Sequence, residues 1–131
     1  MEPLYEQILK LFLVVFLGGL VGLEREISHK PAGLRTHILV CLGSALVTIT
    51  SIDYFAAESS RIVQGIITGI GFIGAGTIIA QGTKGIHGLT TAASLWVVAV
   101  IGISIGVGAY LLSIISTVFV VLILFIGKYK K

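Results

Sequence analysis

The stretch LTTAASLWVVAVIGISIGVGAYLLSIISTVFVVLILFIG, from Leu89 to Gly127, contains 39 residues and no charged side chain. A single helix of that length would extend about 58 Å at 1.5 Å per residue. That is roughly twice the thickness of the hydrocarbon core of a bilayer. The stretch therefore predicts two membrane-spanning helices, near residues 89–105 and 109–127, with the break at Gly106-Val107-Gly108.

The rest of the chain continues this pattern. The 131 residues are 56% hydrophobic and 11% charged, which is far from the composition of soluble domains. Three further apolar runs of about 20 residues are separated by loops in which charge, Pro and Gly gather. These runs lie near residues 4–23, 34–52 and 62–80. We expect one transmembrane domain over 1–131, an all-α integral membrane bundle of about five helices.

Lysine and arginine are distributed unevenly between the two predicted membrane faces. Lys10 and Arg61 fall on one face. The other seven fall on the opposite face, namely Arg25, Lys30, Arg35, Lys84, Lys128, Lys130 and Lys131. Because cytoplasmic loops are enriched in Lys and Arg, this predicts an N-terminus outside and a C-terminus in the cytoplasm.

An internal repeat is a further hypothesis. Phe16-Leu-Gly-Gly followed by Gly33-Leu-Arg-Thr resembles Phe72-Ile-Gly-Ala followed by Gly88-Leu-Thr-Thr. Both pairs would have the same orientation, which gives a parallel 2+2 helix repeat plus one helix, an arrangement known in transporters.

Glycines are concentrated in the third predicted span, at Gly65, Gly69, Gly71, Gly74 and Gly76. Small residues at this spacing allow helix backbones to approach closely. The alternative is that the glycines break the helix and expose carbonyl groups to a permeating ion. The letters of Gly69–Gly74 also fit GxGxxG, but no strand precedes them, so a dinucleotide site is excluded.

Polar residues suggest sites at both ends of the bundle. His37, Cys41, Ser44, Thr48 and Ser51 share one face of the second span, which fits either a helix contact or a water-filled path. Thr90 and Thr91 are expected to cap the fourth helix. Glu24 and Asp53 are the candidate ligands for Mg²⁺, but they fall at opposite ends of the bundle.

The inner charges Glu24, Arg25 and Arg35 have two explanations that stay open. They could pair with one another at the membrane interface without any further function, or they could bind an anion or a carboxylate of a partner. The three histidines have no metal-ligand spacing and the serines have no adjacent base, so we expect neither an enzyme nor a cofactor. Nucleic acid is not an expected partner.

Four motifs together resemble the membrane domain of the MgtC/SapB family. They are Gly19-Leu-Val-Gly-Leu-Glu-Arg-Glu, Ala32-Gly-Leu-Arg-Thr-His, Gly69-Ile-Gly-Phe-Ile-Gly-Ala-Gly and Gly88-Leu-Thr-Thr-Ala-Ala-Ser-Leu-Trp. Members are multi-pass proteins of the bacterial inner membrane, linked to growth under magnesium limitation, to survival of pathogens in host cells and, in some cases, to control of the F-type ATP synthase. Many carry a C-terminal ACT-like domain, whereas this sequence stops at Lys131.

The resemblance implies a set of functional motif residues in this chain. They are Glu24, Arg25, Arg35, Thr36, Gly71, Gly74, Gly76, Thr90, Thr91, Ser94 and Trp96, with Asp53, Arg61 and Gln64 as candidates at the outer face. It implies a protein, expected to be a homo-oligomer, that supports magnesium homeostasis by modulating membrane machinery such as the ATP synthase. The alternative is a transporter or channel for Mg²⁺ or another small ion.

Overall fold

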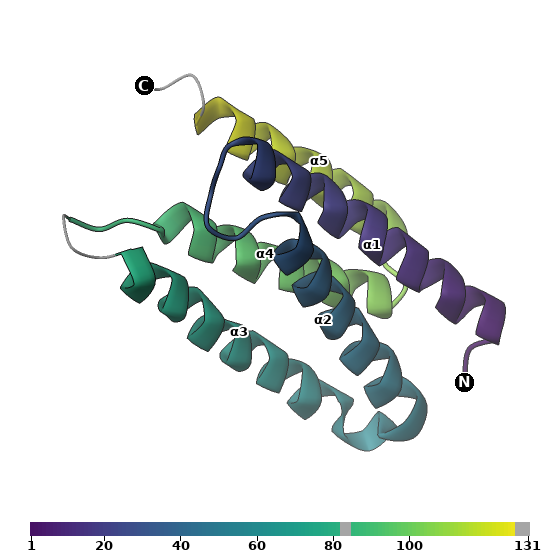
Figure 1. The fold of residues 1–131 in the computed structure, drawn as a ribbon. Coiled ribbons are helices and arrows are strands. Elements are labelled where there is room, and N and C mark those ends of the chain that lie inside the picture. The colour runs from purple at the N-terminus through teal and green to yellow at the C-terminus, as the bar shows by residue number, and fades with distance from the viewer. Residues whose placement is uncertain (82–84, 128–131) are drawn as a thin grey trace.

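The computed structural model describes residues 1–81 and 85–127, which form five α-helices and one short 3-10 turn (Figure 1). They are α1 (Leu4–Ile27), α2 (Leu34–Tyr54), η1 (Ala56–Glu58), α3 (Ser59–Gln81), α4 (Leu89–Gly106) and α5 (Tyr110–Ile126). The expected five-helix bundle is confirmed, although α1 continues past residue 23, because Glu24 and Arg25 are buried and paired within it. Gly82, Lys84 and the C-terminal lysines lie outside the described residues.

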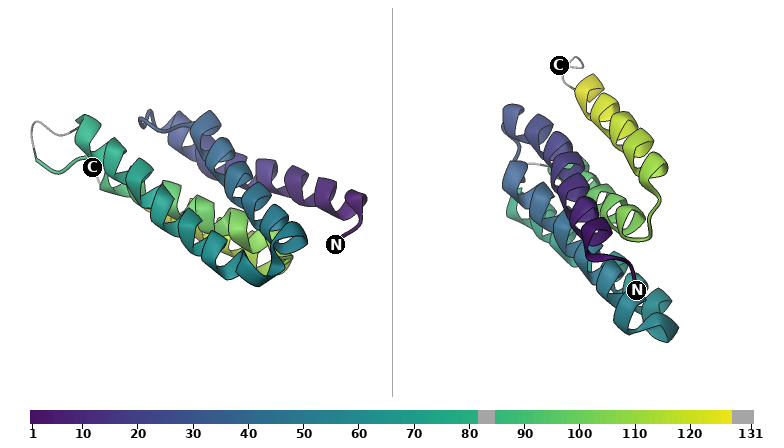
Figure 2. Two further views of the ribbon diagram at one scale, coloured as in Figure 1. Left: turned by 90° about the horizontal axis from the view of Figure 1, so that it is seen from below. Right: turned by 90° about the vertical axis from the view of Figure 1, so that its right-hand side faces the viewer.

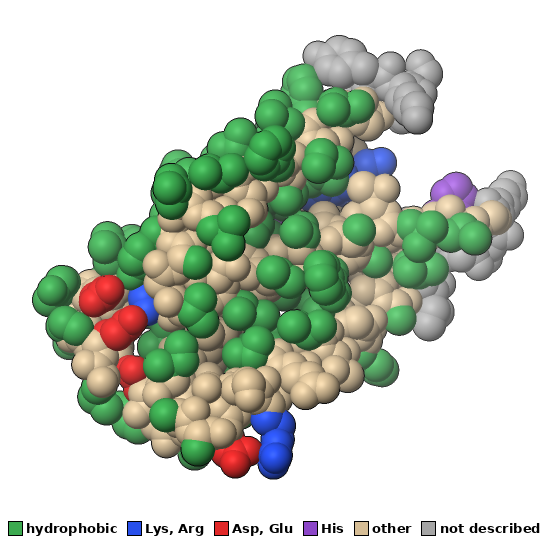
Figure 3. All heavy atoms as spheres, turned by 180° about the vertical axis from the view of Figure 1, so that it is seen from behind, with side chains coloured by type: hydrophobic (Ala, Val, Ile, Leu, Met, Phe, Trp, Pro, Cys, Tyr) green, Lys and Arg blue, Asp and Glu red, His purple; other side chains and the backbone are tan. Residues whose placement is uncertain are grey.

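The helices have the dimensions of membrane spans. Helices α1 to α4 are long and apolar enough to cross a membrane, whereas α5 has 17 residues, close to the lower limit. Successive helices alternate in direction, so the start of α1 and the end of α5 lie at opposite ends of the bundle (Figure 1). Figure 3 shows hydrophobic side chains spread over one flank, with acidic and basic side chains gathered toward the ends.

The break between α4 and α5 lies where the glycines predict it. Gly108 has a φ of 89°, its N–H donates to the Ile105 carbonyl, and the Ala109 N–H donates to the Ser104 carbonyl. This is a Schellman ending, which favours glycine because the left-handed conformation strains residues that have a Cβ.

The start of α4 corrects a prediction. Neither Thr90 nor Thr91 is the N-cap, because the helix already begins at Leu89 and its N-cap is Gly88, with a φ of 89° and no side-chain cap. Thr91 is buried and its hydroxyl lies 3.5 Å from a guanidinium nitrogen of Arg25. The first N–H groups of α4 are therefore left without a side-chain cap.

Helix α2 is the centre of the packing. Its predicted polar face, from His37 to Ser51, is buried against α1 and α4. A Cβ added to Gly22 of α1 would lie 2.9 Å from the His37 Cβ, and one added to Gly106 of α4 would lie 2.8 Å from the Thr48 Cβ. Gly18 and Gly102 make similar contacts one turn away. The face is therefore a helix contact, as small residues predict.

Helix α3 is more exposed than this core. Within α3, Gly74 packs on α4, where an added Cβ would lie 3.4 Å from the Ala92 Cβ. At Gly65, Gly69, Gly71 and Gly76, an added Cβ would have no neighbour within 4 Å. Most glycines of α3 are thus available to something outside this chain.

Candidate functional site

Two clusters of polar side chains lie at opposite ends of the bundle. The Arg25 cluster consists of Glu24, Arg25, Ser28, His37, Thr91 and Ser94, and the Lys10 cluster consists of Glu2, Glu6, Lys10 and Tyr110. Arg25 and Lys10 are both on α1, and 15 residues of helix separate them by about 22 Å. They are therefore two separate sites.

The Arg25 cluster contains a buried ion pair between the adjacent residues Glu24 and Arg25. Arg25 is 3% exposed and Glu24 is 8% exposed. Arg25 Nη1 lies 3.5 Å from Glu24 Oε2, and Arg25 Nη2 lies 3.5 Å from Thr91 Oγ1 on α4. Ser28 donates to the other Glu24 oxygen at 2.8 Å. Both contacts of the guanidinium are long, and its Nε has no hydrogen-bond partner.

His37 joins this cluster across three helices. Its Nδ1 lies 2.8 Å from the Gly33 carbonyl, and its Nε2 lies 2.9 Å from Ser94 Oγ on α4. Because a carbonyl can only accept, Nδ1 carries the proton of the neutral ring. The sequence places His37 on the polar face of the second span and at the end of the motif Ala32-Gly-Leu-Arg-Thr-His, but the set of candidate functional residues does not include it. The motif itself was therefore the available signal.

A pocket of about 440 Å³ opens beside the Arg25 cluster. Glu24, Arg25, Ser28 and Lys30 line it from the end of α1 and the loop that follows. Thr90 at the start of α4 and the last turn of α5 complete it. Three helix ends thus converge on one pocket, whose lining is polar on the side of α1 and α4 and apolar on the side of α5.

The other motif residues are placed apart from this cluster. Arg35 is exposed and Thr36 is half-buried in the first turn of α2. Trp96 is 46% exposed on α4, and Gly71 and Gly76 have open space beside them. The structure therefore brings together Glu24, Arg25, Thr91 and Ser94, but it does not bring together the complete set of functional motif residues.

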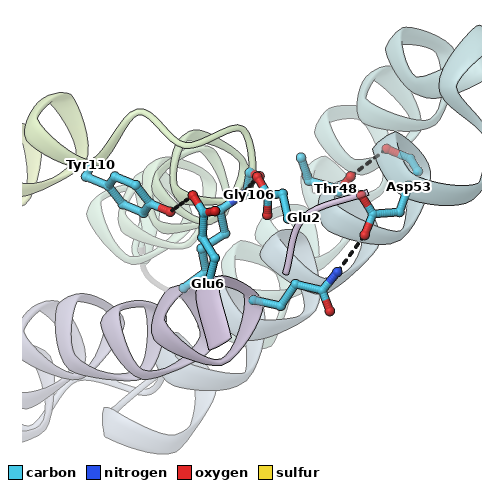
Figure 4. A network of polar contacts seen from close by, with 9 residues as sticks. Glu2, Glu6, Thr48, Asp53, Gly106 and Tyr110 are labelled. Carbon is cyan, nitrogen blue, oxygen red and sulfur yellow. Dashed lines mark hydrogen bonds and ion pairs between the residues drawn. The ribbon is translucent and has the colours of Figure 1, made fainter. Parts of the chain in front are cut away.

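The Lys10 cluster was not predicted, because Lys10 was assigned to the charges of the outer face. Its side chain is 1% exposed, is paired with Glu2 and donates to the Gly106 carbonyl at 2.8 Å. Figure 4 shows Glu2 and Glu6 beside Gly106 and Tyr110. Tyr110 donates to Glu6 at 3.4 Å. Glu6, four residues before Lys10, has the spacing of a helical ion pair, but the structure pairs Lys10 with Glu2 instead.

The outer-face candidates do not form one site. Asp53 accepts a hydrogen bond of 2.6 Å from Gln7 of α1 (Figure 4). Arg61 is exposed and pairs with Glu58 at 3.1 Å, and Gln64 is exposed on α3. Among residues 1–81 and 85–127, no group of three or more His, Cys, Asp or Glu side chains is placed to hold a metal ion.

An all-helical bundle with four membrane-length apolar helices and two polar ends defines a multi-pass membrane protein. The model of the MgtC family matches residues 11–131. The chain belongs to the MgtC family. No solved structure matches it.

Three curated bacterial relatives illustrate the likeness. The putative magnesium transporter YhiD of Escherichia coli K12 is 44% identical over 128 residues, which cover 91% of this chain and 59% of that protein. Protein SrpB of Synechococcus elongatus is 40% identical, over 88% of this chain and 71% of that protein. Protein MgtC of Brucella abortus is 42% identical, over 80% of this chain and 44% of that protein. The chain thus spans about half the length of several relatives.

Proposed function

We propose that this protein supports magnesium homeostasis, or adaptation to low Mg²⁺, in the bacterial inner membrane by modulating other membrane machinery such as the F-type ATP synthase. The role is not enzymatic. Membership of the MgtC family supports the proposal, as does the similarity to a bacterial protein named as a putative magnesium transporter. Relatives in pathogens would connect the same role to virulence.

One observation favours modulation over conduction through a single bundle. An apolar core, tightly packed across α1, α2 and α4, lies between the Lys10 and Arg25 clusters. Its buried members include Val14, Leu17, Val21, Val98 and Ile101. The buried hydroxyls of Ser44 and Thr48 in this region already donate to carbonyls of their own helix. A hydrated ion crossing the core would therefore lose its water and gain few polar ligands, which is strongly unfavourable.

Liposomes that contain a Mg²⁺-sensitive dye test this proposal. Modulation predicts that purified, correctly inserted protein admits no more Mg²⁺ than protein-free vesicles. Entry above that background would favour the alternative, a transporter or channel, if Glu24→Gln or Asp53→Asn abolished it without unfolding the protein. If Mg²⁺ entered as fast with both variants as with the wild-type protein, those two carboxylates would be excluded as Mg²⁺ ligands.

The alternative requires more than one copy of the chain, because a pore would lie between protomers. The open glycines of α3 support a homo-oligomer, since a helix of a second copy could approach their backbone closely. Gly65, Gly69 and Gly76 follow one another at spacings of four and seven residues and so share one helix face. Assembly through this face would serve either proposed function.

Substitutions on α3 separate assembly from folding. Gly69→Leu should shift the protein from oligomer to monomer in native mass spectrometry while its helix content is unchanged. Gly74→Leu should instead lower the thermal stability of the protomer, since Gly74 packs on Ala92. An unchanged oligomer in Gly69→Leu would exclude this face as the interface.

The orientation and the repeat are part of the same proposal. The excess of Lys and Arg supports placing the loop between α1 and α2 in the cytoplasm. The two helix pairs α1–α2 and α3–α4 run in the same sense along the bundle, which supports a parallel 2+2 repeat with α5 as the additional helix (Figure 1).

A further inference from the structure

An apolar groove runs along the membrane-facing side of α1 and α5. Its volume is about 620 Å³, and its walls include Leu13, Phe16 and Leu20 of α1 and Ile114, Val118 and Leu122 of α5. Helix α5 buries little of its own surface, and Figure 2 shows it set apart from α1 in the right-hand view. Apolar side chains on this groove need a covering that is apolar as well.

The groove is long enough to take an acyl chain that crosses one leaflet. It extends along α1 from Leu13 to Ile27, which are fourteen residues and about 21 Å apart. Half of a 30 Å hydrocarbon core is about 15 Å. A single acyl chain of a phospholipid therefore fits within the length of the groove and matches it in polarity.

Glu24 connects this groove to the polar pocket, because it lines both. Beyond Glu24, the pocket adds the polar side chains of Arg25, Ser28, Lys30 and Thr90, together with Ile123 and Leu124 of α5. An occupant of both cavities must therefore be an amphiphile, with a chain beside α5 and a polar group at the helix ends.

Arg25 indicates the charge of that polar group. Its guanidinium lines the pocket at 3% exposure, its Nε has no hydrogen-bond partner, and its two other nitrogens make contacts of 3.5 Å. A buried guanidinium with an unused donor is costly, and phosphate is a ligand that matches it. Lys30 adds a second positive charge, and the uncapped start of α4 presents N–H groups nearby.

We infer that the α1–α5 groove and the pocket at Arg25 together bind one anionic phospholipid, with its phosphate on Arg25 and Lys30 and one acyl chain along α5. Glu24 opposes the phosphate, because it holds the same guanidinium. Removing the charge of Glu24 should therefore strengthen lipid binding, whereas removing that of Arg25 should weaken it.

Native mass spectrometry of the full chain in detergent tests this inference, with dioleoyl phosphatidylglycerol or dioleoyl phosphatidylcholine added. Both headgroups carry a phosphate, but only phosphatidylcholine also carries a quaternary ammonium, which Arg25 and Lys30 repel. We therefore expect phosphatidylglycerol to bind about tenfold more tightly. Arg25→Gln should abolish the preference and Glu24→Gln should increase it. Arg61→Gln, which removes the same charge at the opposite end, should change nothing.

Two further variants test the groove itself. Val118→Trp fills the groove and should weaken binding of both lipids, whereas Leu112→Trp, on α5 outside the groove, should not. Equal affinity for the two lipids, or no increase in Glu24→Gln, would overturn the inference even if Arg25→Gln fails to fold. Displacement of the lipid by inorganic phosphate, together with wild-type binding in Val118→Trp, would also overturn it and assign the pocket to free phosphate.

Discussion

At the scale of the residue, burial separates the charges that matter to the fold from those that only face water. Lys10 and Arg25 are almost completely buried in α1, and each has a carboxylate beside it. Arg61 also pairs with a carboxylate, Glu58, but both side chains are exposed, and such pairs contribute little. An ion pair with a carboxylate therefore matters more to stability at Lys10 and Arg25 than at Arg61.

Lys10→Met should destabilise the protein. It leaves the Gly106 carbonyl without its donor and Glu2, which is partly exposed, without its partner. We expect a loss of about 1–3 kcal/mol, below the cost of breaking a fully buried pair. Thermal unfolding in detergent measures it, with Lys30→Met as the control. If Glu2→Gln in the Lys10→Met background restores no stability, the ion pair is not the reason for the loss.

At the scale of the element, α2 is held by contacts that allow no added atoms. The glycine pairs Gly18/Gly22 of α1 and Gly102/Gly106 of α4 both face its small polar side. The hydroxyl groups of Ser44, Thr48 and Ser51 are bonded to carbonyls of their own helix. These side chains therefore fill the contact without leaving polar groups unpaired.

Gly106→Ala and Gly65→Ala should have opposite effects. The new methyl group at residue 106 would lie 2.8 Å from the Thr48 Cβ, so the helices must separate, at a cost of about 1–3 kcal/mol. At residue 65 it would meet open space, and the higher helix propensity of alanine should give up to about 1 kcal/mol of stability. Unfolding curves in detergent compare the two variants. Equal stability of Gly106→Ala and Gly65→Ala would contradict the close contact between residue 106 and Thr48.

At the scale of the whole molecule, the alternating helices place the loop after α1 and the turn η1 at opposite ends. The apolar flank between them matches the hydrocarbon region, and the acidic and basic side chains visible on this side gather toward its two boundaries (Figure 3). If the proposed orientation is correct, Lys30 faces the cytoplasm and Glu58 faces outward. Both side chains are exposed, so a reagent can reach them.

Cysteine labelling tests this orientation in intact bacterial cells. A membrane-impermeant maleimide should label Glu58→Cys directly, but Lys30→Cys only after the membrane is permeabilised. The native Cys41 is fully buried, so the parent chain should give little background labelling. The reverse pattern would place the N-terminus in the cytoplasm.

The sequence by itself determined the class of protein, the five helices and the break near Gly106, because hydrophobic length and glycine position are local properties of the chain. The family motifs also include Glu24, Arg25, Thr91 and Ser94, which the structure brings together in one cluster. Only the tertiary structure decided that Lys10 is buried, that His37 joins the Arg25 cluster, and that Gly74 packs inside while Gly69 remains open. These outcomes depend on which face of each helix meets its neighbours, and they arise from packing between residues distant in the sequence.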